Sequence, residues 1–278
     1  MAAQFRPDLS PADYFAEPCP KPALSSSGIT TLLYRSPLHF WHAHPALGGG
    51  TQAKDTAATY RGSLVHRLAL GKGDDFRVLP FDDYRTKEAK EARDACIADG
   101  VIPVKPAQYA EAEAMADRIR AAIDDACAGQ DYQTEVVILG ERGGIHRRCM
   151  VDVWCPALGL ALDVKTAAKV TDGWLNRAFA GGYARQDAFY TDLIDEATGD
   201  HGRNRFEFLF VEAEAPFIGR RAKVDEAYRT GGRSEIARAE AIFARCMEAG
   251  EWPGPADYVA SPPAWQVGAW IEAEMEDA

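Results

Sequence analysis

Two aspartates and one lysine have the types and spacing of a catalytic site, because they flank a short turn in the middle of the sequence. Asp152 lies in an apolar run before the segment Pro156-Ala157-Leu158-Gly159, and Asp163 and Lys165 lie in the apolar run after it. Proline and glycine at the two ends of that segment are typical of a tight reversal. The pattern predicts a β-hairpin that carries two carboxylates and one ammonium group.

The predicted hairpin has a defined register. With residues 156–159 as the loop, Cys155 faces Leu160, and counting back along the two strands brings Asp152 opposite Asp163. Alternation along the second strand places Asp163 and Lys165 on one face and the apolar residues between them on the other. Two carboxylates with Cβ atoms about 5 Å apart repel each other unless a cation lies between them.

A hard divalent cation is the expected partner of this pair. Mg²⁺ and Mn²⁺ prefer oxygen ligands and retain several waters, so two carboxylates and a backbone carbonyl leave room for a phosphate and an attacking water. Lys165 could hold or deprotonate that water and balance the charge that develops on the phosphate. However, an isolated Asp-x-Lys sequence more often forms a salt bridge on an exposed sheet face, so other residues must support the interpretation.

Two further pairs of residues provide that support. Gly62 and His66 are four residues apart in GSLVH, and Gln186 and Tyr190 are four apart in QDAFY. This spacing puts the members of each pair on one face of a predicted helix. Each pair alone has a simpler explanation as part of a core or a helix surface. In the order GxxxH, D, DxK, QxxxY they form a known signature.

Helices and strands must position these motifs. Helices are expected at about 25–36, 56–71, 86–98, 106–128, 173–196 and 233–249, after an extended arm over residues 1–24. Short strands are expected at about 77–79, 101–104, 135–139, 149–154, 160–164 and 206–211. This order predicts an α/β (α+β) fold in which helices flank a central mixed β-sheet.

Composition and charge limit the possible classes of protein. The chain has 278 residues, of which 47% are hydrophobic and 26% charged, as in ordinary globular proteins. A net charge of -11 argues against a protein that coats nucleic acid nonspecifically, although an enzyme with a local basic groove stays possible. Six cysteines without a CxxC pair indicate neither a zinc ribbon nor an iron–sulfur cluster. Without a long apolar run or a signal-peptide pattern, we expect a cytoplasmic protein with no membrane segment.

Taken together, the motifs resemble the PD-(D/E)xK nuclease superfamily, in the branch of RecE (exodeoxyribonuclease VIII), RecB and lambda exonuclease. The resemblance covers about residues 25–265 and is carried by SSSGITTLLYRSPLHFW, GSLVHRLALG, EVVIL, HRRCMVDVW, LALDVKTA and CMEAGEWPGPADYVASPPAW. It implies a restriction-endonuclease-like core. Many members have glutamate where this chain has Asp163, and RecE-like enzymes share the aspartate.

The resemblance also implies an activity and partners. The expected enzyme is a Mg²⁺- or Mn²⁺-dependent deoxyribonuclease that hydrolyses double-stranded DNA from an end, 5′ to 3′, in phage-type recombination or repair. A ring-shaped homo-oligomer and a separate single-strand annealing protein are expected as partners. We expect one nuclease domain over 1–278, with a helical part at 25–130, a catalytic core at 131–214 and a helical C-terminal segment with a tail at 215–278.

Site roles follow from the same resemblance. Lys165 is expected to serve the nucleophilic water, and Gln186 and Tyr190 to orient the site and contact the DNA backbone. The expected metal ligands are His66, Asp152, Asp163 and the Val164 carbonyl.

Several other residues have two open interpretations. Glu135 either contacts the metal through water or caps an exposed strand. Ser25 and Ser27 either bind a terminal 5′-phosphate or cap a helix. Arg148, next to the catalytic strand, is a candidate phosphate contact.

Two further clusters are less convincing as functional sites. The histidines 39, 42 and 44 resemble a metal tract, but their aromatic neighbours favour a packed helix end. The basic residues 220, 221 and 223 could line a DNA channel or an exposed face.

Two alternatives to an exonuclease stay open. One is an endonuclease of the same fold, and the other is an inactive DNA-binding or assembly subunit.

Overall fold

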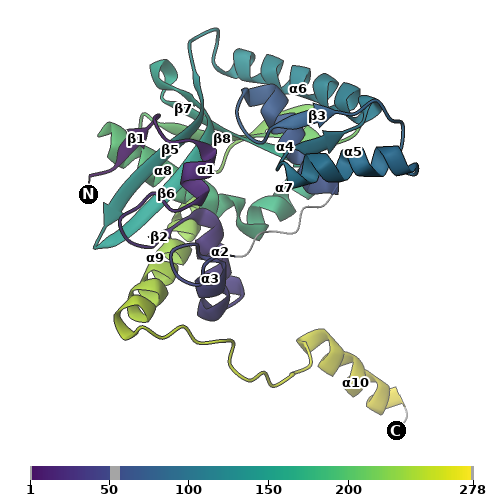
Figure 1. The fold of residues 1–278 in the computed structure, drawn as a ribbon. Coiled ribbons are helices and arrows are strands. Elements are labelled where there is room, and N and C mark those ends of the chain that lie inside the picture. Colours follow the sequence, from purple (N-terminus) through teal and green to yellow (C-terminus); the bar gives the residue numbers. More distant parts are fainter. Residues whose placement is uncertain (1, 51–56, 277–278) are drawn as a thin grey trace.

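A seven-stranded mixed β-sheet forms the centre of the computed structural model, which describes residues 2–50 and 57–276 (Figure 1). The strand order is β1 (Gln4–Arg6), β5 (Gln133–Arg142), β6 (Ile145–Cys155), β7 (Leu160–Ala167), β8 (Arg205–Glu212) and β9 (Gly219–Ala222), and β2 (Ala23–Leu24) also pairs with β6. Strands β7 and β8 are parallel, as are β2 and β6, and the other pairs are antiparallel. A separate parallel pair consists of β3 (Phe76–Val78) and β4 (Ile102–Val104). The predicted mixed sheet is therefore confirmed.

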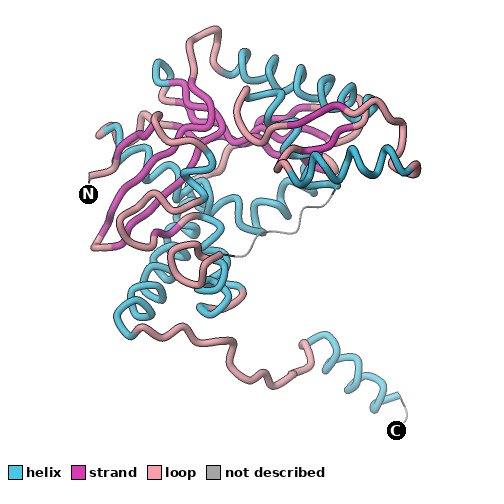
Figure 2. Tube along the Cα trace, in the orientation of Figure 1, coloured by secondary structure: helices cyan, strands magenta, loops and turns pink. Residues whose placement is uncertain are grey.

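Helices cover both faces of the sheet (Figures 1 and 2). On one face α2 (Ser26–Tyr34), α8 (Ala184–Thr198) and α9 (Glu226–Ala249) enclose a core that includes Phe206, Phe208 and Phe210. On the other face α4 (Ala57–Leu70) and α6 (Pro106–Ala126) enclose a core that includes Leu209 and Val211. Alternation along β8 explains the two sets, because successive side chains of a strand point to opposite faces. The remaining helices are α1 (Pro11–Phe15), α3 (Pro37–Ala43), α5 (Lys87–Ala98), α7 (Asp172–Ala178) and α10 (Ala264–Glu276).

The hairpin between β6 and β7 has the predicted register. Cys155 pairs with Leu160, and the next pairs along the ladder follow the expected count. Residues 156–158 form a single 3-10 turn, and Gly159 ends it with a φ of 58°, a left-handed conformation that glycine adopts without strain. The loop that sets the register is therefore the segment expected from its proline and glycine.

The N-terminal arm is more structured than expected. Instead of an extended arm over residues 1–24, the chain forms β1, α1 and β2, and both strands join the central sheet. Strand β1 covers the outer edge of β5, which would otherwise leave unpaired backbone groups. Phe5 stacks on Trp154 with ring centroids 5.1 Å apart. These contacts between distant segments could not be read from local composition.

The single long helix expected over 173–196 is broken into two. Helix α7 ends at Ala178, a π-helical turn spans Phe179–Tyr183, and α8 begins at Ala184. Gly182 in this turn has a φ of 135°, which interrupts the helical path. The periodicity of the apolar residues continues across the break, so the pattern alone predicted one helix.

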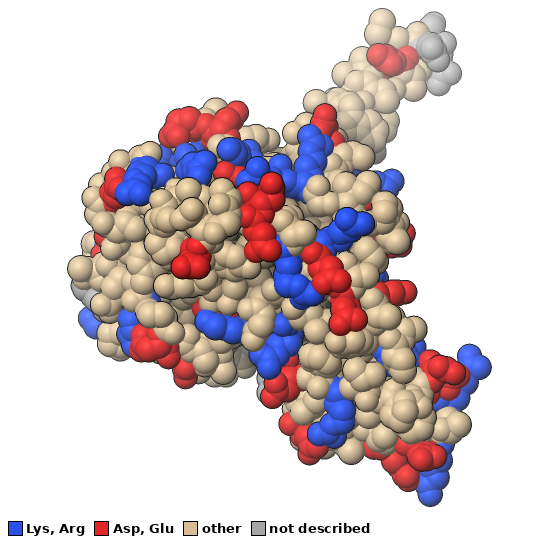
Figure 3. Space-filling view, turned by 90° about the horizontal axis from the view of Figure 1, so that it is seen from above, with Lys and Arg blue, Asp and Glu red and all other residues tan. Residues whose placement is uncertain are grey.

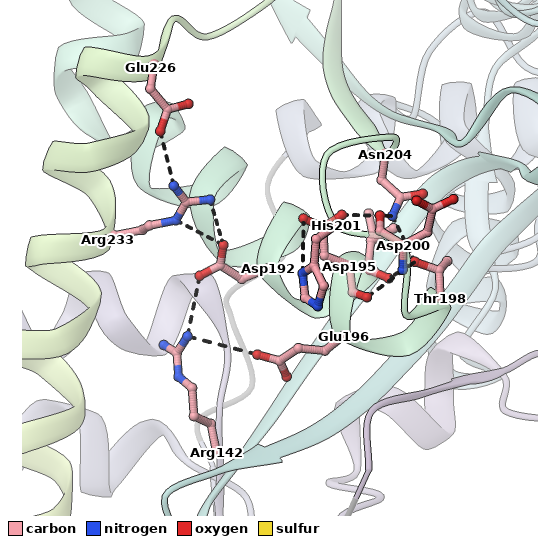
Figure 4. Close-up of polar contacts among 11 residues, drawn as sticks. Arg142, Asp192, Asp195, Glu196, Thr198, Asp200, His201, Asn204, Glu226 and Arg233 are labelled. Carbon is pink, nitrogen blue, oxygen red and sulfur yellow. Dashed lines mark hydrogen bonds and ion pairs between the residues drawn. The ribbon is translucent and has the colours of Figure 1, made fainter.

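A network of ion pairs links β5, α8 and α9 (Figure 4). Arg142 of β5 contacts Asp192 of α8 at 3.4 Å and Glu240 of α9 at 2.9 Å. Arg233 of α9 contacts the same Asp192 at 3.0 Å and Glu226 at 3.2 Å. Because several charges share partners, this network restrains the helices more than isolated surface pairs would.

The C-terminal region departs from the body of the protein. Helix α9 begins at Glu226, earlier than the expected residue 233, because the Asp225 side chain caps it by accepting a hydrogen bond from the Tyr228 amide at 2.9 Å. After an irregular segment, α10 extends away from the sheet (Figure 1). Over the ranges that the structure describes, none of the helices combines the length and apolar character needed to span a bilayer.

Candidate active site

Asp152 and Asp163 lie side by side at the point where the ladder between β6 and β7 ends. The last pair of that ladder is Val153 with Leu162, so the next residues on each strand are the two aspartates. Asp152 Oδ2 accepts a hydrogen bond from the Val164 amide at 2.6 Å. Both aspartates are buried. The arrangement brings two acidic groups together in a largely apolar setting.

Asp163 is held by two polar side chains. Lys165 Nζ lies 2.5 Å from Asp163 Oδ2, and Gln186 Nε2 donates to Asp163 Oδ1 over 2.8 Å. Lys165 and Asp163 share a face because they are two apart on β7, whereas Gln186 reaches them from the first turn of α8. The break between α7 and α8 therefore sets the position of Gln186 relative to the hairpin.

The alternation of β6 slips at Asp152. Val151 packs in the core under α8, but Val153, two residues further on, packs in the opposite core under α6. Two residues apart on a regular strand would share a face. The neighbouring residue on β5, Glu135, has a φ of 51°, and no pair forms between Glu135 and Asp152 although the flanking pairs keep one register. A non-glycine residue in this conformation is strained by about 1–3 kcal/mol, which is a common feature of functional sites.

His66, Glu135 and Asp152 form a group that fits a metal ion. One ligand atom from each lies within 4.8 Å of the others, and His66 Nδ1 is 3.9 Å from Glu135 Oε1. Imidazole and carboxylate groups together suit divalent ions such as Mn²⁺, and carboxylates suit Mg²⁺. Asp163 lies near this group, and its two carboxylate oxygens contact Lys165 and Gln186. Glu135 thus lies where the expected contact with a metal would place it, and its role stays a prediction.

The electrostatics of the site favour an added positive charge. Burial and the neighbouring charge of Asp163 raise the pKa of Asp152 to about 7. Burial opposes protonation of His66, but its interaction with Glu135 and the charge of Asp152 prevail and raise the pKa of His66 to about 9. Burial likewise disfavours the charged form of Lys165, yet the charges of Asp163 and Asp152 raise its pKa. The buried Asp152 carboxyl thus holds its proton more tightly than usual, so a divalent ion suits this donor set.

An open cleft of about 640 Å³ gives access to the two aspartates and the lysine. Its walls come from α1, the start of α2, the hairpin and the region around the helix break. The predicted residues that line it are Ser25, Ser27, Asp152, Asp163, Lys165, Gln186 and Tyr190. The fold therefore assembles residues that are up to 165 positions apart in the sequence (25 to 190) around one cavity.

Several lining residues carried no signal in the sequence. Tyr183 has its ring 5.8 Å from Lys165 Nζ, and it belongs to the π-helical turn that the periodicity did not indicate. Arg185, Trp174 and Tyr14 also line the cleft. Only Tyr14 lies in a segment with a recognisable local pattern, the capping box that begins α1 at Ser10.

Ser25 and Ser27 serve the helix and also face the cleft. Ser25 caps α2 by accepting a hydrogen bond from the Gly28 amide at 3.2 Å, and its hydroxyl lies 3.1 Å from that of Ser27. Tyr190 packs its ring against Phe206, with centroids 5.2 Å apart. The Val164 amide donates a hydrogen bond to Asp152 Oδ2.

Arg148 does not have the expected role as a phosphate contact. Its side chain is buried, Nε lies 3.2 Å from Glu17 Oε2, and the guanidinium stacks over the Tyr14 ring and donates to the Tyr14 carbonyl. The reason is the N-terminal arm, which folds over this part of β6. Arg148 therefore anchors the arm.

Residues of the histidine cluster and of the basic cluster at 220–223 contact other residues of the fold. His44 Nε2 lies 3.0 Å from Glu17 Oε2, and the Ser36 hydroxyl lies 2.6 Å from His39 Nδ1, consistent with the expected packed helix end. Arg220 contacts Asp172 at 2.6 Å, and Lys223 contacts Glu207 at 3.2 Å. The face drawn in Figure 3 likewise shows Lys and Arg interspersed with Asp and Glu. These pairings weaken the interpretation of residues 220–223 as a DNA channel.

The mixed sheet with its hairpin of aspartates and lysine defines a PD-(D/E)xK-type domain, the fold class of a large group of nucleases. Residues 32–262 match the family described as "PDDEXK-like domain of unknown function (DUF3799)", and the chain belongs to this family. The solved structures include a similar protein from Eubacterium rectale, described as a "Putative exonuclease", with a TM-score of 0.61 and 17% identity over 92% of this chain and 96% of that one. At this identity the similarity concerns the fold. No curated protein matches the sequence.

Proposed function

We propose that the protein is a Mg²⁺- or Mn²⁺-dependent deoxyribonuclease that hydrolyses double-stranded DNA from an end in the 5′ to 3′ direction. The observation that carries this proposal is the convergence of Asp152, Asp163 and Lys165 on one open cleft, with Lys165 Nζ 2.5 Å from Asp163 Oδ2. Membership of a PDDEXK-like family supports it. The description of the similar Eubacterium rectale protein supports the choice of an exonuclease.

The residues of the site have different roles in phosphodiester hydrolysis. The carboxylates of Asp152 and Asp163, with His66, Glu135 and the Val164 carbonyl, would hold the divalent ion. When bound, the ion supplies a Lewis acid and lowers the pKa of water. These residues also set where the scissile phosphate lies, because a buried acidic site attracts a phosphate only when a cation offsets its charge.

Lys165 acts on the attacking water and on the negative charge of the transition state. Its ammonium group stays protonated beside Asp163 and can donate hydrogen bonds to oxygens in the cleft. Gln186 keeps Asp163 oriented through its 2.8 Å hydrogen bond. Tyr190, together with Ser25 and Ser27, lines the cleft where a DNA backbone would enter. The Ser25 hydroxyl caps α2 and lies near the Ser27 hydroxyl, and both hydroxyls are candidates to bind a terminal 5′-phosphate.

Release of nucleotides from linear duplexes tests this function. Duplexes labelled at one end or the other, with and without a 5′-phosphate, are incubated with Mg²⁺, with Mn²⁺ or with chelator. We expect metal-dependent release that begins at the 5′ end. Circular duplex is the control, because an exonuclease leaves it intact whereas an endonuclease nicks it. Absence of cleavage and of metal binding would instead support an inactive DNA-binding subunit.

The assembly and the partner are further parts of the proposal. A ring-shaped homo-oligomer and a single-strand annealing protein are expected from the RecE-type resemblance. Light scattering after size exclusion measures the oligomer, and a monomer at all concentrations would contradict the ring.

A further inference from the structure

A second cavity, of about 400 Å³, opens beside the catalytic cleft. It lies between the helix break at Phe179–Tyr183 and the first half of α9, and we call it the base pocket. Gly182 and Arg185 line both the base pocket and the catalytic cleft, so the two cavities meet at these residues. Its volume is in the range of sites that hold small organic groups, roughly 300–1,000 Å³.

The lining of the base pocket includes an exposed glycine, Gly231, that packing does not require. Gly231 lies inside α9, where glycine is less favourable than alanine, yet a Cβ at this position would meet no atom within 4 Å. Its neighbour Gly232 differs, because a Cβ there would lie 2.9 Å from the Ala184 carbonyl oxygen. Close packing of α8 on α9 therefore explains Gly232. Gly231 instead faces open space, which a large side chain at this position would occupy.

The walls of the base pocket suit a planar aromatic group. Tyr228 is 41% exposed although it lies beside the cavity, and its ring centroid is 6.4 Å from that of the buried Phe179. An exposed aromatic ring beside a nucleic-acid site offers a stacking surface for any base.

The charges of the base pocket favour a base over a free nucleotide. Asp225 and Glu235 contribute two carboxylates to the lining, against the single guanidinium of Arg185. Arg185 is 3% exposed, is paired with Glu235, donates a hydrogen bond to Thr30 Oγ1 over 2.9 Å, and has a buried Nε without a hydrogen-bond partner among the described groups. The two carboxylates would repel the negative charge of a triphosphate. An uncharged base would not be repelled, provided that its phosphate stays near Arg185 at the junction with the catalytic cleft.

We propose, on the basis of the nuclease function proposed above, that the base pocket holds one unpaired base of the DNA strand that is hydrolysed. The path from the catalytic cleft crosses Gly181 and Gly182, which have no side chains to block it, and a Cβ at Gly181 would meet nothing within 4 Å. The strand bound at Asp152 and Asp163 thus continues into the pocket. The base stacks on Tyr228, and the adjacent phosphate lies near Arg185.

Fluorescent DNA tests the base pocket. Duplexes with a short single-stranded extension on the hydrolysed strand carry 2-aminopurine at one position at a time, and they are bound with Mg²⁺ to protein carrying Lys165→Ala to slow cleavage. We expect quenching at one position, loss of this quenching in Tyr228→Ala and its retention in Tyr228→Phe. We also expect Gly231→Leu to weaken binding of the extended duplex about tenfold. Gly268→Leu is the matched control, because Gly268 also lies inside a helix with no atom near a Cβ, but on the distant α10 (Figure 1).

The following outcomes would overturn the proposal that the base pocket holds an unpaired base. Equal binding by the Gly231→Leu and Gly268→Leu proteins, with no quenching that depends on Tyr228, would overturn it and leave the nuclease function intact if the wild type still cleaves duplex. Loss of the quenching on addition of free deoxynucleotide would assign the pocket to a free nucleotide instead. A wild-type protein that neither binds nor cleaves any DNA would overturn the pocket and the nuclease function together.

Discussion

The Val164 amide donates a hydrogen bond to Asp152 Oδ2 across the end of the catalytic hairpin, over 2.6 Å. The strand that carries Asp163 and Lys165 thereby fixes the carboxylate of the opposite strand. A backbone donor cannot rotate away as a side chain can, so the orientation of Asp152 is set by the hairpin register. Changes to this hairpin, or to the segments that support it, should therefore have separable effects on activity and stability.

Lys165→Ala should abolish most hydrolysis while preserving the fold. Removing an ammonium group aimed at the reacting phosphate costs roughly 100- to 1,000-fold in kcat. Lys169→Ala is the control, because Lys169 is an exposed lysine just beyond the same strand. Initial rates on linear duplex measure the effect, and melting temperatures confirm folding. A wild-type rate in folded Lys165→Ala protein would refute the site assignment.

Asp152→Asn should stabilise the protein when metal is removed. Burial and the charge of Asp163 raise the pKa of Asp152 to about 7, above its unfolded value of about 3.9. An acid with a raised pKa in the fold lowers stability as the pH rises from about 4 to about 7, and asparagine lacks this loss. In EDTA the variant should therefore gain up to about 1–4 kcal/mol near neutral pH relative to wild type, and little at pH 4.

Bound metal should reduce the stability advantage of the Asp152→Asn protein. Saturating Mg²⁺ or Mn²⁺ stabilises wild-type protein by about 2.7 kcal/mol at one hundred times Kd, and Asp152→Asn protein should gain much less. Thermal unfolding at several pH values, with metal and with EDTA, measures both effects. An equal gain on adding metal in both proteins would contradict the role of Asp152 as a ligand.

Glu17→Gln should destabilise the protein at neutral pH but not in acid. The Glu17 side chain is 3% exposed and contacts His44 Nε2 at 3.0 Å and Arg148 Nε at 3.2 Å. Burial opposes the charged form, but these two partners prevail and lower the pKa of Glu17. The stabilisation is therefore present above its unfolded pKa of about 4.3 and is lost as the pH falls through the lower folded value.

The expected loss for Glu17→Gln at pH 7 is about 2–4 kcal/mol, since a buried cationic partner is left unpaired. Denaturant unfolding at pH 7 and at pH 3 measures the difference. Asp8→Asn, at an exposed pair with Arg6, is the control and should change little. A constant difference between Glu17→Gln and wild type at both pH values would contradict the ion-pair account.

Gly182→Ala should disturb the break between α7 and α8, whereas Gly181→Ala should not. At Gly182 the φ is 135°, and a Cβ would lie 2.7 Å from an Arg185 nitrogen, so alanine costs about 1–3 kcal/mol. At Gly181 a Cβ meets nothing, so a change within about 0.5 kcal/mol is expected. Free energies of unfolding measure both. Equal effects at the two positions would show that the strain at Gly182 is absent.

The sequence alone determined the hairpin and the chemistry of the residues on it. Pro156 and Gly159 mark the reversal, so the register from Cys155–Leu160 to Val153–Leu162 followed by counting, and the period of two along a strand put Asp163 and Lys165 on one face. The mixed sheet followed from the order of apolar runs. Such features depend on neighbours in the chain, which is why a single sequence is enough to predict them.

Only the tertiary structure decided which distant segments complete the site. Glu135 leaves the regular strand conformation, the alternation of β6 slips at Asp152, and the helix break brings Tyr183 near Lys165. The N-terminal arm buries Arg148 against Glu17. These positions result from packing between segments far apart in the chain, where local preferences of a kcal/mol or less are outweighed by the burial of side chains and the pairing of buried charges.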